Sequence, residues 1–180
     1  MGVPLAGGLP YGVVSLNANA VNPTFAYSAQ GVAPVAVNYP LFCLEAGPWK
    51  NTRLKRVIIW NPGSQTTAGL VTFSLVRTTT AGSGTTATPA SMDNTDAAFT
   101  GTLRIPGQTA GTAGTVLYQT QIWVPNAAAA SSPYILEFHE LFTQKSPTIA
   151  AGVTNGIFLR CDTGGAAFAS LSFTVEFTEE

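Results

Sequence analysis

The chain has 180 residues, of which only 9% are Asp, Glu, Lys or Arg while 46% are hydrophobic, and its formal net charge is −1. An ordinary globular domain carries about 25% charged residues. So few charges give a free monomer little electrostatic protection against self-association. The composition therefore favours a protein that works assembled, packed against copies of itself or against a larger partner.

Charge and hydropathy exclude two classes of partner. The densest cationic stretch is residues 50–56 and the calculated pI is about 5.8, whereas proteins that bind nucleic acid usually carry a clustered basic stripe. No segment reaches the roughly 18 apolar residues that a membrane span needs. The N-terminus also lacks the cationic start and apolar core of a secretory signal. We expect synthesis in the cytoplasm, and no direct contact with nucleic acid or membrane.

Residues 1–23 are rich in Gly, Pro, Ala and Asn, and apolar side chains interrupt them at intervals. The stretch is too apolar for a solvated tail and too broken for a regular helix. We expect an extended arm that becomes ordered against a neighbour. The predicted domains are an N-terminal arm at 1–30 and a β-sandwich at 31–180.

From residue 24 onward, the hydrophobic pattern has the period of two that is typical of strands. Pro40 interrupts one candidate strand and suits an edge or a bend, and Asn61-Pro62-Gly63 is a turn signal that ends another. The predicted strands are 24–29, 35–44, 54–60, 70–77, 97–105, 115–124, 134–142, 148–150, 156–161 and 169–177.

The last of these strands has the cleanest alternation. Leu171, Phe173, Val175 and Phe177 face one way with Ala169, and Ser or Thr or Glu side chains face the other. This pattern indicates a sheet with one buried face. Eight to ten short strands, with turns every 8 to 14 residues and no long amphipathic helix, predict an all-β fold. We expect an antiparallel β-sandwich that is jelly-roll-like.

Residues 78–96 combine Thr, Gly, Ala and Ser with the run Asp93-Asn94-Thr95-Asp96, and we expect a long loop there. Long loops in compact domains are usually functional or make contacts. The loop and the arm are therefore the predicted interface segments. The candidate interface residues are Leu5, Leu9, Tyr11, Val13, Val14, Thr79, Thr80, Asp93 and Asp96.

The inventory for acid–base chemistry is small. The single histidine, His139, lies near Glu137 and Glu140, and a catalytic interpretation would make it a general base. On a strand, however, Glu137 and His139 share a face about 7 Å apart while Glu140 points the other way. A polar strand face with a Glu–His pair, or a cross-strand salt bridge, is the favoured interpretation. We expect a protein that is not an enzyme and has no catalytic residue.

No cofactor fingerprint is present. Asp93 and Asp96 flank a turn and offer oxygens to Ca²⁺, but the run lacks the Gly and the distal Glu of an EF-hand loop, and Asx residues form turns unaided. The glycines at 82–84 and 164–165 are not followed by the Lys-Ser/Thr of a phosphate loop. We expect neither a cofactor nor a metal.

Tryptophan and cysteine each leave two interpretations open. One interpretation of the tryptophans is a sugar-stacking platform, formed by Trp49, Trp60 and Trp123. The other is packing in the core or at an interface, and it is favoured because aromatic residues are important in cores and in interfaces. Cys161, in an apolar strand pattern, is either a small buried hydrophobe, which is favoured, or half of a disulfide with Cys43.

Several strand and turn phrases between residues 50 and 180 resemble the virion structural jelly-roll proteins of tailed bacteriophages. They are Leu54–Pro62, the Thr-rich 74–89 with 92–98, Lys145–Gly152 with Gly156–Leu159, and the closing 175–179. The resemblance implies a capsid decoration (cement) protein or a related head or neck component. It also implies a homotrimer whose partner is the major capsid protein or another virion protein.

Three functions follow from these observations. The first is a non-enzymatic protein on the outer capsid surface, held there by subunit contacts. The second is a carbohydrate- or receptor-binding β-sandwich of a phage tail, which would need an exposed aromatic cleft. The third is a jelly-roll shell subunit. A shell that packages RNA by charge neutralisation would need a basic arm, and the sequence shows none.

Overall fold

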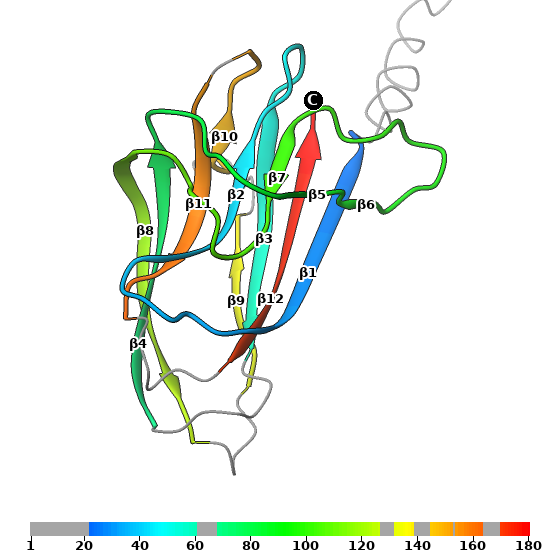
Figure 1. The fold of residues 1–180 in the computed structure, drawn as a ribbon. Coiled ribbons are helices and arrows are strands. Elements are labelled where there is room, and N and C mark those ends of the chain that lie inside the picture. Colours follow the sequence, from blue (N-terminus) through cyan, green and yellow to red (C-terminus); the bar gives the residue numbers. More distant parts are fainter. Residues whose placement is uncertain (1–21, 61–67, 127–131, 139–144, 153, 164–169) are drawn as a thin grey trace, which may run out of the picture.

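The structure is a computed structural model, and it describes residues 22–60, 68–126, 132–138, 145–152, 154–163 and 170–180. The described residues form strands, turns and irregular connections, and they contain no helix long and apolar enough to cross a membrane. Two antiparallel sheets pack against each other (Figure 1). The predicted all-β antiparallel sandwich is therefore confirmed.

The first sheet, called here the β12 sheet, has the order β10-β3-β12-β1-β6, and β9 pairs with the same strand, β3, as β10 does. Its strands are β1 (Thr24–Val32), β3 (Thr52–Trp60), β6 (Ala90–Ser91), β9 (Tyr134–Glu137), β10 (Thr148–Ile149) and β12 (Leu171–Glu179).

The second sheet, called the β11 sheet, has the order β5-β7-β2-β11-β4-β8. Its strands are β2 (Tyr39–Glu45), β4 (Gly69–Thr78), β5 (Thr86–Ala87), β7 (Thr102–Arg104), β8 (Ala113–Val124) and β11 (Gly156–Cys161). The strand β8 forms one margin of the molecule, while β1 and β6 lie at the other (Figure 1).

Most predicted strands appear within two or three residues of their predicted bounds, and 156–161 coincides with β11. Three predictions were wrong in part. The strand predicted at 35–44 begins only at Tyr39, and Val35 and Val37 are exposed in an irregular segment. The strand predicted at 97–105 is reduced to β7, and the predicted loop 78–96 contains the short strands β5 and β6. Residues 139–142 and 169 lie outside the described residues.

Pro40 is the second residue of β2 and pairs with β11 on one side. The other neighbour, β7, pairs only with Cys43–Glu45, so Pro40 has a local edge position, and the register with β11 shifts between Pro40 and Phe42. A bulge is one of the few places where a sheet tolerates proline. The Pro40 carbonyl accepts a hydrogen bond from the Gly107 amide at 2.8 Å, outside the regular ladder.

The core lies between the two sheets, and alternation explains which side chains fill it. Leu171, Phe173, Val175 and Phe177 of β12 are buried as predicted. Phe173 contacts Phe42 of the opposite sheet with ring centroids 5.8 Å apart, which is within the range of favourable aromatic pairs. The opposite face of β12 departs from the expectation, because Ser172 and Thr178 are buried as well. Ser172 is short and lies opposite the large Trp60 of β3.

The division into an arm at 1–30 and a sandwich at 31–180 stays a prediction. Residues 1–21 lie outside the described residues, and β1 spans the boundary between residues 30 and 31. The jelly-roll form of the sandwich also stays a prediction.

Candidate interaction surface

The connection between β4 and β5 is tied to the β11 sheet by an ion pair with little exposure. Arg104 Nη2 of β7 lies 3.0 Å from Glu45 Oε2 of β2, and Arg104 Nε lies 3.3 Å from Glu45 Oε1. The Gly82 amide donates to the same Oε1 at 2.6 Å. One carboxylate thus holds both a neighbouring strand and the loop, so this part of the predicted interface has a defined shape.

A second cluster of buried side chains lies on the outer face of the β11 sheet, consisting of Cys43, Val76, Ala110 and Phe158. The connection that leads into β8 covers it, and the Cys43 thiol lies 3.7 Å from the Ala110 carbonyl oxygen. Cys43 and Cys161 are both buried and unpaired. The prediction that Cys161 is a small buried hydrophobe is confirmed.

Burial controls the chemistry of both thiols. It raises the pKa of Cys43 to about 12, with a further increase from the charge of Glu45 that Arg104 opposes. It also raises the pKa of Cys161 to about 12. Because the thiolate is the reactive form, neither cysteine is suited to nucleophilic or redox work at neutral pH.

The candidate interface residues Thr79 and Thr80 are exposed, but their polar groups are used within the chain. The Thr79 amide donates to the Thr112 carbonyl at 2.9 Å, and the Thr112 amide donates to Thr80 Oγ1 at 2.9 Å. These bonds lie at the end of the paired strands β4 and β8. The two threonines therefore shape the loop, and their contact with a partner stays a prediction.

The candidate interface residues Asp93 and Asp96 form a turn directly after β6. Asp93 Oδ1 accepts from the Thr95 amide at 2.9 Å and from Thr95 Oγ1 at 2.8 Å, and these bonds lower the pKa of Asp93. Asp96 donates its amide to the Asp93 carbonyl at 3.1 Å. This is the Asx turn that the sequence favoured over a Ca²⁺ loop. Within the described residues, no three acidic, His or Cys side chains gather as a metal site would require.

The structure does not bring the predicted interface residues together. Thr79 and Thr80 follow β4, beside β8, whereas Asp93 and Asp96 follow β6, beside β1, at the other margin of the molecule (Figure 1). Five of the candidates lie outside the described residues, as does His139; the five are Leu5, Leu9, Tyr11, Val13 and Val14. Glu137, predicted to share a face with His139, lies 3.6 Å from Arg56 Nη1 in an ion pair.

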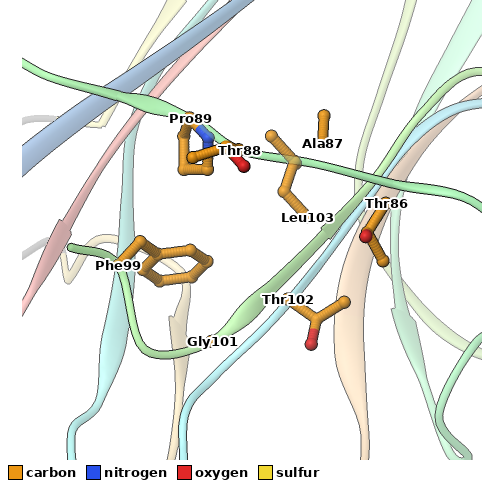
Figure 2. A pocket seen from close by; sticks show the side chains of 8 residues that line it. All are labelled: Thr86, Ala87, Thr88, Pro89, Phe99, Gly101, Thr102 and Leu103. Carbon is orange, nitrogen blue, oxygen red and sulfur yellow. The ribbon is translucent and has the colours of Figure 1, made fainter.

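A pocket of about 200 Å³ lies where the connection from β5 to β6 passes over the segment leading into β7. Figure 2 shows the Phe99 ring below Pro89 and Thr88, with Gly101 and Thr102 along the floor. Phe99 packs on Phe177 with centroids 4.9 Å apart. The pocket is smaller than the roughly 300–1,000 Å³ of most ligand sites, and its lining carries no charge. It is therefore a packing feature of the loop.

Charged side chains on the described surface are mostly neutralised by partners within the chain. Four arginines pair with carboxylates on neighbouring strands or residues. The pairs are Arg53–Glu180, Arg56–Glu176, Arg104–Glu45 and Arg160–Asp162. Lys50 pairs with the buried Glu179 at 3.3 Å. The few charges of this chain thus stabilise its own sheets and leave little field to repel a neighbour.

Two tryptophans are not in the core. Trp49 is 87% exposed before β3, and Trp123 is 61% exposed at the end of β8. The start of β3 and the end of β8 lie at opposite ends of the sandwich (Figure 1). Core packing is therefore excluded for both, and the described residues do not join them in one stacking platform. Contact with a partner is the interpretation that remains for each of these two tryptophans.

The feature that the sequence analysis missed is the strand β8. It was predicted as a strand, but its place at the end of the β11 sheet was not, and nearly all its side chains are exposed. An edge position depends on strand order, which the alternation of side chains does not encode. The one available signal was the absence of charge throughout residues 113–124.

Comparison with protein-family models, with curated proteins and with solved structures finds no match for this chain.

Proposed function

We propose that this chain is a non-enzymatic structural protein of a virion, which binds and stabilises the outside of a bacteriophage capsid through subunit contacts. In this role the chain is a decoration (cement) protein that forms a homotrimer. It binds the major capsid protein or another virion protein at the surface of the virion. The jelly-roll version of the sandwich belongs to the same proposal.

The observation that supports this proposal best is the distribution of charged and apolar groups. The charged side chains are largely paired within the chain, while β8 exposes Val116, Leu117 and Trp123. Buried apolar area is the main favourable term in most protein association. A surface that is low in charge and rich in exposed apolar side chains is suited to permanent contacts that tolerate salt.

The direct test is to look for the chain in the particles made by the genetic element that encodes it. We expect mass spectrometry to detect it in purified virions, and gold-labelled antibody to bind intact particles. Particles assembled without the chain should release DNA at a lower temperature. Absence from the particles, or labelling only after they are disrupted, would contradict the proposal.

The second candidate, a glycan- or receptor-binding module of a phage tail, is favoured by the exposure of Trp49 and Trp123. Aromatic rings that lie free on a surface are suited to stacking against sugars. A fluorescence titration with a glycan panel tests this function. Saturable quenching that Trp49→Ala or Trp123→Ala abolishes would favour it over the capsid role.

A further inference from the structure

The four edges of the two sheets differ greatly in length. The β12 sheet ends in β6, with 2 residues, on one side and in β9 and β10, with 4 and 2 residues, on the other. The β11 sheet ends in β5, with 2 residues, and in β8, with 12 residues. Short edge strands are a common protection against unwanted pairing. The strands β5, β6, β9 and β10 are short, although β6 covers only Phe25 and Ala26 of the nine-residue β1, whereas β8 is long and has no strand beyond it in the described residues.

The chemistry of β8 offers no other protection. Natural edge strands carry Lys, Pro or inward-pointing charges that prevent another strand from pairing, but residues 113–124 contain neither proline nor any charged residue. Its register shifts occur before Tyr118, and from Tyr118 to Val124 the pairing with β4 is regular. Within the described residues, β8 has one strand neighbour. Its other side therefore presents a ladder that an added strand can complete.

The N-terminal segment of the chain has matching chemistry. Residues 1–21 contain no charged side chain, and Tyr11-Gly12-Val13-Val14-Ser15-Leu16 is rich in residues that favour strands. Pro10 lacks an amide donor, so it sets the start of a pairing stretch at residue 11. Six residues extend about 20 Å, close to the length of the regular part of β8.

The positions of the two segments point to pairing between copies. Asn22 leads into β1, which is separated from β9 by β12 and β3. The hydroxyl of Tyr134 in β9 forms a hydrogen bond of 2.7 Å with the hydroxyl of Tyr118 in β8, so β9 lies near β8. The path within one copy therefore spans about 14 Å sideways and 10 Å between sheets, and it must pass around the core. Residues 17–21 reach at most about 17 Å. In two copies placed side by side, β1 of one lies next to β8 of the other.

We propose that residues 11–16 of one copy add a strand to the free edge of β8 in the next copy. The donor segment precedes β1, and β1 and the acceptor strand β8 lie at opposite margins of the molecule (Figure 1), so the contact is head-to-tail. Such a contact closes into a ring when the rotation allows it. The inference deepens the proposed function by identifying the contact between subunits, but its test needs no capsid.

The experiment compares the full chain with a chain that lacks residues 1–20, by size-exclusion chromatography with light scattering. We expect a closed oligomer for the full chain and a monomer with an unchanged circular dichroism spectrum for the truncated chain. A synthetic peptide of residues 9–18 should bind the truncated chain one to one and protect the amides of β8 from hydrogen exchange.

Matched variants separate pairing from misfolding. Val14→Pro should shift the full chain to monomer, because proline removes a donor from the pairing stretch, while Ala6→Pro should leave the oligomer intact. Gln121→Lys should weaken binding of the peptide at least about tenfold by placing a charge on the regular part of the edge, where Gln121 is exposed. Val37→Lys, at an exposed residue outside β8, should not.

Contrary results bear separately on this inference and on the proposed function. An oligomer that persists without residues 1–20 would place the contact elsewhere, for example between two β8 strands. A monomeric full chain that excludes the peptide would show pairing within one copy. A ring that forms as expected but is absent from virions would refute the capsid role and leave this contact standing. A chain found in virions that is unaffected by Val14→Pro would do the reverse.

Discussion

At the residue scale, the shape of the loop after β4 depends on Glu45. Its carboxylate accepts hydrogen bonds from Arg104 and from the Gly82 amide in a site with little exposure. Glu45→Gln removes the charge and keeps the shape, so we expect a loss of about 2 kcal/mol in the free energy of unfolding. Urea denaturation measures this loss.

Glu137→Gln is the control, because Glu137 pairs with Arg56 at 3.6 Å in a partly exposed site. Exposed pairs contribute little, so we expect a loss below about 1 kcal/mol. Equal losses for the two variants would show that the Glu45 site does not anchor the loop.

The two buried thiols predict how stability changes in alkaline solution. The pKa values of Cys43 and Cys161 are about 12 in the folded chain, whereas an unfolded thiol titrates near 8.5. Above about pH 9 the unfolded state loses these protons and the native state keeps them. The free energy of unfolding therefore falls as pH rises, by up to about 1.4 kcal/mol per pH unit for each thiol.

Urea denaturation between pH 8 and pH 10 measures this fall. Tyr27 and Tyr118 also have a raised pKa, but unfolded tyrosine titrates near 10, so they add to the fall only at the upper end of this window. The double variant Cys43→Ala/Cys161→Ala should lose most of the slope, although it begins from a lower stability. An unchanged slope in that variant would assign the effect to other groups.

At the element scale, the end of the paired strands β4 and β8 depends on Gly111. Its φ is 78°, and a Cβ there would lie 2.3 Å from the Thr80 carbonyl oxygen. Gly31 has a similar φ of 64° with nothing within 4 Å. We expect Gly31→Ala to cost about 1 kcal/mol, the conformational penalty alone, and Gly111→Ala to cost more than about 2 kcal/mol because the backbone must also move.

Thermal or urea unfolding of the two variants measures the difference. The comparison isolates steric crowding, because both substitutions add one methyl group at a left-handed position. If the two losses were equal, the close approach of residues 80 and 111 would not be present in solution.

The strands show how far a sequence pattern carries. Residues 171–177 were predictable because alternation reports directly which side chains are buried, and residues 156–161 because a short apolar run bounded by turns is typical of a strand buried on both faces. Residues 35–38 were not, because Val35 and Val37 imitate a strand pattern while both are exposed. The two-residue strands β5 and β6 were not predictable either. They exist only because β7 and β1 lie beside them.

At the scale of the whole molecule, the proposed contact between copies should be insensitive to salt. Residues 1–21 and 113–124 carry no charged side chain, so screening has no ion pair to weaken there. We expect the dissociation constant of the oligomer to change less than about threefold between 0.05 and 1 M NaCl, measured by sedimentation velocity. A weakening of tenfold or more would show that charged groups hold the copies together.

The candidate site was predictable only in part. Low charge indicated assembly, and the Thr-rich loop and the Asp93 turn were identified as segments. The sequence did not indicate that Thr79 and Thr80 would form hydrogen bonds with Thr112. It also did not indicate that the Asp93 carboxylate would accept hydrogen bonds from Thr95. Whether a polar group is free for a partner depends on neighbours far along the chain.

The sequence by itself determined that this chain forms strands, that those strands bury one face in an antiparallel sandwich, and that its surface is poor in charge. These properties follow from the period and composition of the side chains, which are local. Only the tertiary structure decided which strand would be the long free edge, and that four of the five arginines would be neutralised by nearby carboxylates. Both depend on strand order and register, which are set by pairing between segments distant in sequence.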